Sequence, residues 1–139
     1  MSKSYKIKDG NYLDSSSVVH NKKQLSELLN AKWRQATLNS DFFTAGTVQY
    51  IQIGNLVIIN LNEVVINEDY FFSNSTTVLA SGLPTNVTSG ITLLNQGDGQ
   101  NDSNSVRVRV LNGNILLHWT RVKKYSNGGI SGTIIASAS

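Results

Sequence analysis

One hairpin sequence restricts the folds open to this chain more than any other feature does. Residues 48–61 read V-Q-Y-I-Q-I-G-N-L-V-I-I-N-L, two runs of β-branched, aromatic and aliphatic residues around a Gly-Asn pair. Glycine at the first central position of a two-residue loop favours a type II′ turn, so we expect a tight hairpin at Gly54-Asn55. Such a hairpin would carry apolar side chains on both of its faces, although the core of a sandwich can receive only one.

Pairing outward from this turn sorts the apolar side chains into two sets. One face carries Ile51, Ile53, Leu56 and Ile58, and the other carries Val48, Tyr50, Val57, Ile59 and Leu61. Leaving either set in water would forgo several kcal/mol, at about 25 cal/mol per Å² of apolar area. We therefore expect a homo-oligomer that buries the second face. Its expected interface consists of hairpin residues and residues of a preceding helix: Tyr50, Val57, Ile59, Leu61, Leu25 and Leu29.

Short strands divided by turn residues are expected along the chain after Leu38. They lie near 46–53, 56–67, 76–80, 90–95, 105–111, 115–122 and 130–136. The 11 glycines, the single proline and the many Asn, Ser and Thr residues are typical of a turn-rich β protein. The sequence predicts a mainly β fold, an antiparallel β-sandwich of the jelly-roll kind, for a head at residues 39–139.

The first part of the chain, residues 1–38, has a different pattern. Asn21 followed by Gln24 matches a capping box, which indicates the start of a helix. Apolar residues then recur at helical spacing: Leu25, Leu28, Leu29, Trp33 and Ala36. We therefore expect one short stem helix from about Lys22 to Ala36, leading into the sandwich.

A second hairpin is expected around Asn112-Gly113, the favoured type I′ pair. On the face that we assign to the core, Val110 lies opposite Ile115, Val108 opposite Leu117 and Val106 opposite Trp119. The other face carries Arg107, Arg109, His118 and Thr120. A slip of one residue would bury the arginines, so this register is strongly specified.

The polar face of this second hairpin is the candidate binding site. Arg107, Arg109 and His118, with Tyr125 further along the chain, are suited to an anionic sugar or a teichoic-acid phosphate. The alternative is an outer strand that its charges keep soluble. The aromatic run at 70–72 could stack on a sugar, or it could alternate between core and interface.

No motif in the sequence specifies a reaction, a metal site or a cofactor. The glycine-rich loop 95–104 holds two aspartates, but it fails the EF-hand template because Arg109 stands where a bidentate glutamate is required. Neither histidine belongs to a nucleophile motif, and Glu68-Asp69 reads as a solvated strand end. We expect a protein that is not an enzyme and that uses no metal or cofactor.

Composition narrows the range of partners. The formal net charge is +3, but the basic residues are spread along the chain, so nucleic-acid binding is not indicated. The apolar runs are far shorter than the roughly 20 residues of a membrane helix, and the first residues lack the apolar block of a signal peptide. With 0 cysteines, the fold depends on packing rather than on disulfides. We expect neither membrane insertion nor nucleic-acid binding.

The order of these segments resembles a known family. A stretch S-S-S-V-V-H-N-K-K-Q-L-S-E-L-L-N precedes T-V-Q-Y-I-Q-I-G-N-L-V-I-I-N, and A-S-G-L-P-T-N and a last strand I-S-G-T-I-I-A-S follow. Together they are similar to the terminal domains of tail-fibre and baseplate receptor-binding proteins of tailed phages and prophages of Gram-positive bacteria. The resemblance covers nearly the whole chain and rests on the style and order of the segments. It transfers no binding residue.

This resemblance implies a short helical stem, a β-sandwich head and commonly a trimer. It implies binding of a host cell-wall or surface saccharide and contact with other tail or baseplate proteins. The protein would be made in the bacterial cytoplasm and located in the phage tail. Two alternatives stay open: a monomeric bacterial carbohydrate-binding or surface module, and a purely structural virion subunit.

Overall fold

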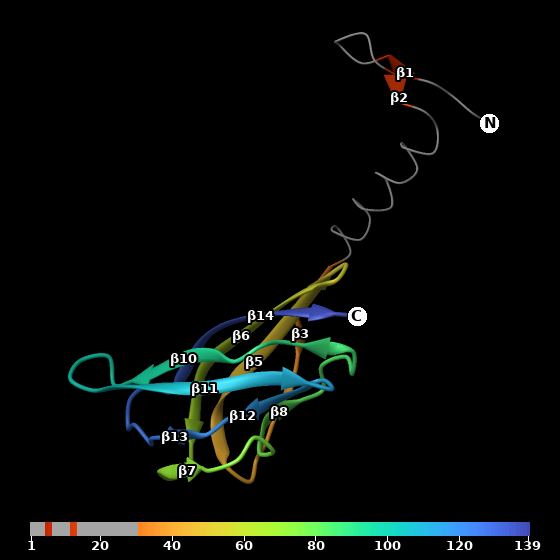
Figure 1. Cartoon of the computed structure of the whole chain (residues 1–139). Helices are drawn as coiled ribbons and strands as arrows, with labels where there is room; N and C mark the ends of the chain where they lie inside the picture. Colours follow the sequence, from red (N-terminus) through yellow and green to blue (C-terminus); the bar gives the residue numbers. More distant parts are fainter. Residues whose placement is uncertain (1–4, 7–11, 14–30) are drawn as a thin grey trace. The chain divides into compact units, whose positions relative to one another are not determined.

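The computed structural model describes residues 5–6, 12–13 and 31–139. The chain divides into two compact units, Met1–Ala31 and Lys32–Ser139 (Figure 1). In the first unit, strands β1 (Tyr5–Lys6) and β2 (Tyr12–Leu13) pair antiparallel. The site described below belongs to the second unit.

The second unit is built mainly from one antiparallel sheet. Its strands are β3 (Arg34–Gln35), β4 (Thr37–Leu38), β5 (Phe43–Ile53), β6 (Leu56–Ile66), β8 (Val78–Ser81), β9 (Val87–Thr88), β10 (Thr92–Gly97), β11 (Ser103–Leu111), β12 (Asn114–Leu117) and β14 (Ile130–Ala138). They follow the order β3-β5-β6-β14-β10-β11-β12-β8-β4, and β9 pairs with β14. Strands β7 (Tyr70–Phe72) and β13 (Thr120–Val122) form a separate two-stranded sheet.

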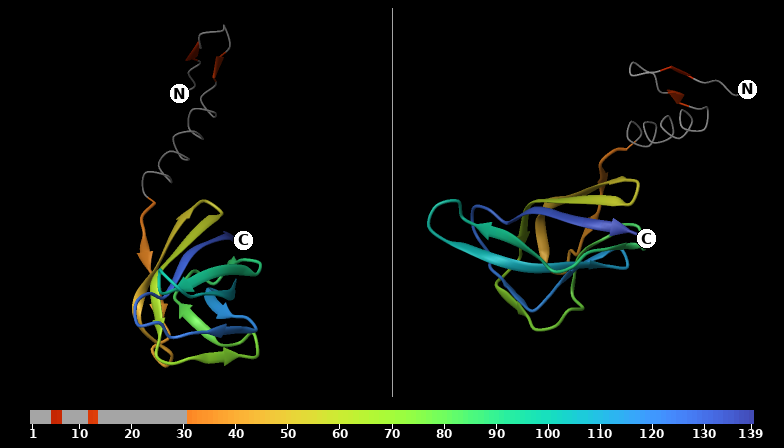
Figure 2. Two further views of the ribbon diagram at one scale, coloured as in Figure 1. Left: turned by 90° about the vertical axis from the view of Figure 1, so that its left-hand side faces the viewer. Right: turned by 45° about the horizontal axis from the view of Figure 1, so that its top comes forward.

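The short segment 34–38 brings the two ends of the large sheet together. Its first half, β3, pairs with β5, and its second half, β4, pairs with β8 at the opposite end of the strand order. Between them, the N–H of Ala36 donates to the carbonyl of Val48 at 2.9 Å. Figure 2 shows the resulting curled, nearly closed sheet.

The mainly β, antiparallel prediction is confirmed, but one rolled sheet replaces the two packed sheets of a jelly-roll sandwich. Irregular pairing within β5, β6 and β14 provides the physical reason, because bulges bend strands and increase their twist. A strongly curved sheet closes on itself and buries its inner face without a second sheet.

The predicted helix does not extend to Ala36. Arg34 lies opposite Tyr50, and Gln35 lies opposite Gln49, in antiparallel pairing. Hydrogen bonds to the edge of β5 satisfy the backbone here and outweigh the helical spacing of the apolar residues. The earlier part of the predicted helix, with Leu25 and Leu29, lies outside the described residues. Within the described part of the chain, no helix is long and apolar enough to cross a membrane.

The hairpin at Gly54-Asn55 has the predicted register. Ile53 pairs with Leu56, and the pairing continues regularly to Val48 opposite Leu61. Gly54 has a φ of 60°, as the first central residue of a type II′ turn requires. The sequence therefore predicted correctly which side chains share a face.

The choice of the face that forms the oligomer interface was wrong. Tyr50, Val57, Ile59 and Leu61 are buried within a single chain, Val57 and Ile59 at 0% exposure. They belong to a core cluster shared with β8, β11 and β12, because the curvature of the sheet turns this face inward. The face outside the core is instead the one with Ile51 and Ile58.

The hairpin at Asn112-Gly113 follows the predicted register only in part. Val110 pairs with Ile115 and Val108 with Leu117, as expected. The predicted pair of Val106 with Trp119 is wrong, since β12 ends at Leu117 and Trp119 is 56% exposed.

A left-handed backbone at Trp119, with a φ of 47°, shifts the alternation of side chains after β12 by one residue. Thr120, predicted on the polar face, is buried instead. Its Oγ1 accepts a hydrogen bond from the N–H of Arg107 at 3.1 Å.

Candidate functional site

The β5–β6 hairpin is irregular at the end remote from its turn. The pairing of β6 shifts register against β5 and against β14 on both sides of Glu63. Glu63 itself has a φ of 51°, a left-handed conformation that is uncommon for residues other than glycine. Bulges redirect side chains and are frequent next to functional sites. Glu63 is therefore the natural starting point for a site.

Two glycines hold the backbone around Glu63. A Cβ atom on Gly46 would overlap the carbonyl oxygen of Glu63, and one on Gly129 would lie 2.5 Å from the carbonyl oxygen of Val64. Gly46 also has a φ of 104°, which glycine adopts without strain. The backbone of 63–64 is packed between these glycines, so the direction of the Glu63 side chain is determined by the fold.

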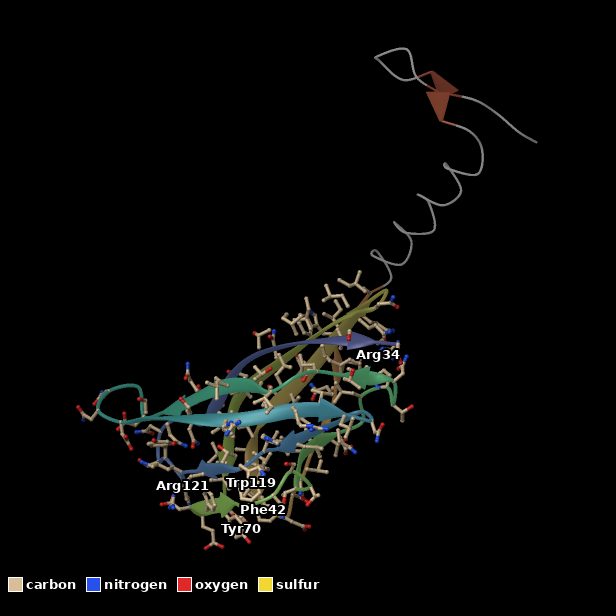
Figure 3. The ribbon with its side chains drawn as sticks, in the orientation of Figure 1. Arg34, Phe42, Tyr70, Trp119 and Arg121 are labelled. Atoms are coloured by element: carbon tan, nitrogen blue, oxygen red, sulfur yellow. The ribbon has the colours of Figure 1, made fainter. Side chains whose placement is uncertain are left out.

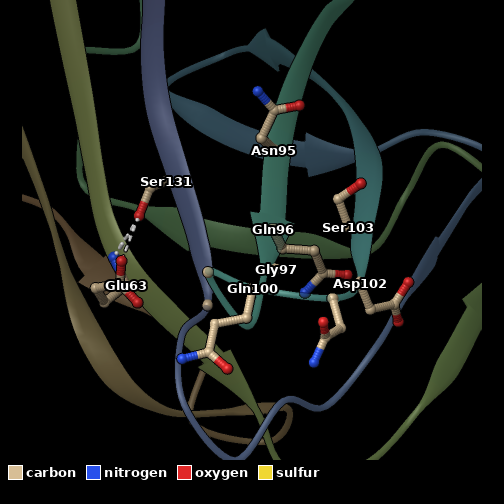
Figure 4. A pocket seen from close by; sticks show the side chains of 11 residues that line it. Glu63, Asn95, Gln96, Gly97, Gln100, Asp102, Ser103 and Ser131 are labelled. Carbon is tan, nitrogen blue, oxygen red and sulfur yellow. Dashed lines mark hydrogen bonds between the residues drawn. The ribbon is translucent and has the colours of Figure 1, made fainter.

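Glu63 borders an open polar pocket of about 600 Å³. Figure 4 shows Glu63 and Ser131 on one side of it and Asp102 and Ser103 on the other. The lining comes from β6, β10, the loop after β10, the first residue of β11, and the chain just before and at the start of β14. It consists of Glu63, Asn95, Gln96, Gly97, Gly99, Gln100, Asn101, Asp102, Ser103, Gly129 and Ser131.

Ser131 fixes the carboxylate of Glu63. The Glu63 N–H donates to Ser131 Oγ at 2.9 Å, and this hydroxyl donates to Glu63 Oε1 at 3.2 Å. Among the described residues, these are the hydrogen bonds of the Glu63 side chain and N–H. The carboxylate is thus oriented by one hydroxyl and remains exposed to solvent at the edge of the pocket.

Asp98 shapes the loop on the far side of the pocket. Its Oδ1 accepts hydrogen bonds from the N–H groups of Gln100, Asn101 and Asp102 at 2.9, 2.8 and 3.1 Å. These bonds, that of Gln100 first, hold the pKa of Asp98 below its usual value of 3.8. The Asp98 carboxylate therefore organises the loop through backbone hydrogen bonds, and the described residues contain no group of three or more His, Cys, Asp or Glu side chains that could hold a metal ion.

A buried glutamine links the pocket to the small β7–β13 sheet. Gln96, 3% exposed, donates from Nε2 to the carbonyl of Lys123 at 2.9 Å and accepts from the Lys123 N–H at 2.7 Å. Asn104 donates to Gln96 Oε1 at 2.7 Å and to the carbonyl of Arg121 at 2.8 Å. This network attaches the chain after Trp119 to β10 and β11.

Three of the predicted ligand-binding residues lie together outside this pocket. Arg107 and Arg109 share the outer face of β11, and the N–H of His118 donates to the carbonyl of Arg107 at 3.0 Å. The Nδ1 atom of His118 lies 2.7 Å from Ser75 Oγ. They therefore form part of an outer, basic surface, as the sequence predicted, but they do not line the pocket.

Tyr125, the fourth of these residues, contacts the loop after β10 that borders the pocket. Its hydroxyl donates to Asp102 Oδ2 at 3.0 Å, and the Nζ atom of Lys123 lies 3.6 Å from the same oxygen. Partial burial, and then the hydrogen bond to the Asp102 carboxylate, raise the pKa of Tyr125. Tyr125 thus supports the wall of the pocket from outside.

Glu63 and the pocket were not predicted from the sequence. The signal that points to them is glycine within or beside strand patterns, at Gly46 and Gly129, since such glycines often mark bulges. Trp119 was predicted to lie in the core, because strict alternation of side chains leaves no room for a left-handed residue.

No protein-family model, no curated protein and no solved structure matches this chain. The chemistry of the pocket is therefore the guide to its ligand. Amides and hydroxyls both donate and accept hydrogen bonds, and carboxylates accept them, which suits a small molecule rich in hydroxyl groups.

Proposed function

We propose that this chain is a non-enzymatic saccharide-binding protein of the phage tail or baseplate type, and that the pocket beside Glu63 holds the sugar. One observation carries the proposal: a glutamate in a left-handed conformation, fixed between bulges, borders an open pocket lined by amides, hydroxyls and carboxylates. Sugar hydroxyls pair with such groups. The proposal involves no cofactor.

The strength expected of such a site is modest. A hydrogen bond to a charged group is worth about 1.5–3 kcal/mol. An open pocket leaves part of the sugar in solvent, so a single site would bind weakly. Several copies of the chain in one assembly would raise the apparent affinity for a polysaccharide by multivalency.

The proposal includes assembly into a homo-oligomer, with a trimer as the form that the resemblance implies. Support comes from the outer face of the sheet, where Ile51, Ile58 and Ile135 form one row across β5, β6 and β14. Ile135 is 61% exposed, and Leu56 extends the row. Burial against identical copies would remove this apolar surface from water. Contacts with other tail proteins and a location in the virion belong to the same proposal.

Binding is tested with the full chain on an array of bacterial cell-wall and surface glycans, followed by calorimetry on the glycans that bind. Glu63→Gln keeps the shape of the side chain and removes its charge. We expect affinity to fall about 10- to 100-fold, as the loss of a charge-assisted hydrogen bond implies. The matched control is Glu68→Gln, since Glu68 is exposed and does not line the pocket.

Three results would contradict parts of the proposal. An array and a host cell-wall pulldown without binding would favour a purely structural subunit. Equal affinities of Glu63→Gln and Glu68→Gln would place the sugar elsewhere. The mass of a single chain in light scattering would favour the monomeric carbohydrate-binding module, a reading supported by the burial of Val57 and Ile59 within one chain.

A further inference from the structure

A second surface, built on β7 and β13, combines exposed aromatic rings with a cation. Phe71 is 50% and Trp119 is 56% exposed. Phe71 lies opposite Arg121 in the β7–β13 pairing, and the guanidinium carbon of Arg121 is 5.7 Å from the centroid of the Phe71 ring. Figure 3 shows Trp119 and Arg121 at the end of the unit where β7 and β13 lie. We call Phe71, Trp119 and Arg121 the aromatic corner.

The backbone of Trp119 has an unfavourable conformation for its side chain. At a φ of 47°, the Cβ atom of Trp119 lies close to the following carbonyl oxygen, so glycine or asparagine would suit the position better. The neighbouring residues impose it: the His118 N–H donates to Arg107, the Trp119 N–H donates to Asn74 at 3.2 Å, and Thr120 is buried. The fold thus leaves more than half of a large indole exposed to solvent, outside the core cluster.

A cluster of rings keeps β7 in place at the aromatic corner. The ring of Phe42 lies 5.4 Å from that of Tyr70 and 5.2 Å from that of Phe72, in edge-to-face contacts. Tyr70 and Phe72 are 4.7 Å apart. These contacts hold the strand on which Phe71 stands, so Phe71 supports the guanidinium plane of Arg121 from a rigid position.

The Arg121 guanidinium forms no ion pair with any of the described residues. In the part of the chain that the structure describes, the only ion pair joins Lys123 to Asp102, so no carboxylate there lies within 4.0 Å of the Arg121 guanidinium. The acidic residues nearest to Phe71 in the sequence are Glu68 and Asp69. The Asp69 carboxylate accepts a hydrogen bond from the Lys124 N–H at 2.7 Å. The aromatic corner therefore has a guanidinium available for an anion.

We propose that the aromatic corner binds an acidic saccharide, a pyranose that carries a carboxylate. The apolar face of the sugar ring would stack on the indole of Trp119, and the carboxylate would accept paired hydrogen bonds from Arg121. Phe71 positions Arg121 and does not contact the sugar in this arrangement. The inference goes beyond the pocket at Glu63, because it uses different residues and a different ligand chemistry.

The experiment uses three probes with the full chain. A tetrasaccharide of alternating glucuronic acid and N-acetylglucosamine has rings and charge, chitotetraose has rings without charge, and poly(glycerol phosphate) has charge without rings. Only two tryptophans are present, so Trp33→Phe leaves Trp119 as the single indole reporter. We expect the acidic tetrasaccharide to change the Trp119 emission and to bind at least about 10-fold more tightly than chitotetraose.

Substitutions separate binding from folding. Trp119→Asn suits a left-handed backbone, so we expect an equal or higher Tm together with at least about a 10-fold loss of affinity for the acidic tetrasaccharide. Arg121→Gln should remove the preference for the acidic over the neutral probe. Lys124→Gln, which removes an exposed positive charge just beyond β13, is the control and should change affinity less than about 2-fold.

The outcomes that overturn the proposal are distinct. An unchanged Trp119 emission with the acidic tetrasaccharide, or an equal response to poly(glycerol phosphate), would exclude ring stacking at this place. A lower Tm of Trp119→Asn with unchanged affinity for the acidic tetrasaccharide would show that the indole stabilises the fold and does not bind the sugar. A loss of affinity in Glu63→Gln but not in Trp119→Asn would assign the acidic sugar to the pocket and leave the aromatic corner without this role.

Discussion

The two ends of the β5–β6 hairpin follow different rules. From Val48 to Leu61 the pairing is regular, and each side chain takes the face that simple alternation predicts. Beyond Leu61 the register shifts against both neighbouring strands, and Glu63 adopts a left-handed backbone. Both ends contribute buried side chains to the core, and the irregular end also borders the polar pocket beside Glu63.

This difference teaches where to look for function in a β protein. A regular strand has only two directions for its side chains, and packing uses both of them. A bulge or a left-handed residue opens a third direction at a cost in backbone strain, so a side chain can be directed at a ligand. Glu63 at the pocket and Trp119 at the aromatic corner are both of this kind.

The largest effect is expected from a substitution in the regular end of the β5–β6 hairpin. Ile59→Asp places a carboxylate without a partner at a position of 0% exposure, which we expect to cost more than about 4 kcal/mol and to unfold most of the protein. Circular dichroism and urea unfolding measure this. Ile58→Asp, one residue away on the outer face, should keep the fold and lower the mass in light scattering. A folded Ile59→Asp protein would contradict the inward direction of this face.

An intermediate effect is expected at the irregular end. Gly129→Ala forces a Cβ atom against the carbonyl of Val64, and we expect a loss of about 1–3 kcal/mol together with weaker saccharide binding. Gly90→Ala is the matched control, because no atom lies within 4 Å of its Cβ position. The control should be neutral or stabilising by up to about 1 kcal/mol in urea unfolding. Equal stabilities of the two variants would mean that the backbone at Glu63 is not held by glycine.

The smallest effect is expected from a change of pH, which should alter the loop held by Asp98 but not a two-residue hairpin turn. The pKa of Asp98 is lowered in the folded state from its usual value of 3.8. Its three backbone hydrogen bonds therefore persist at a pH above 3.8, and they are lost only as the pH falls through the lower pKa of the folded state. Amide chemical shifts of Gln100 and Asn101 should then move, while those at Asn112-Gly113 stay constant, since no carboxylate among the described residues is hydrogen-bonded to that turn. Asp98→Asn should abolish the pH response of the loop. A chemical-shift transition with its midpoint above pH 3.8 would contradict the proposed role of Asp98.

Sequence reasoning succeeded wherever a tight turn and simple alternation acted together. Gly54-Asn55 and Asn112-Gly113 set two registers that the structure reproduces next to each turn. It failed where one residue left the alternation, as at Trp119, and where strand pairing competed with helical spacing, as at Arg34-Gln35. Gly46 and Gly129 mark the bulge at Glu63 in the sequence, but the pocket lining could not be assembled from it, because the lining comes from strands far apart in the sequence.

By itself the sequence determined the antiparallel β class, the main strands and which side chains share a face, because these depend on local alternation and turn chemistry. Only the tertiary structure decided which apolar face of the first hairpin points inward, that one sheet rolls up instead of two sheets packing, and where Glu63 and Trp119 point. The reason is that both faces of that hairpin are apolar, so the choice between them depends on curvature and on contacts with β8, β11 and β12. Bulges and left-handed residues are likewise stabilised by neighbours that no local pattern contains.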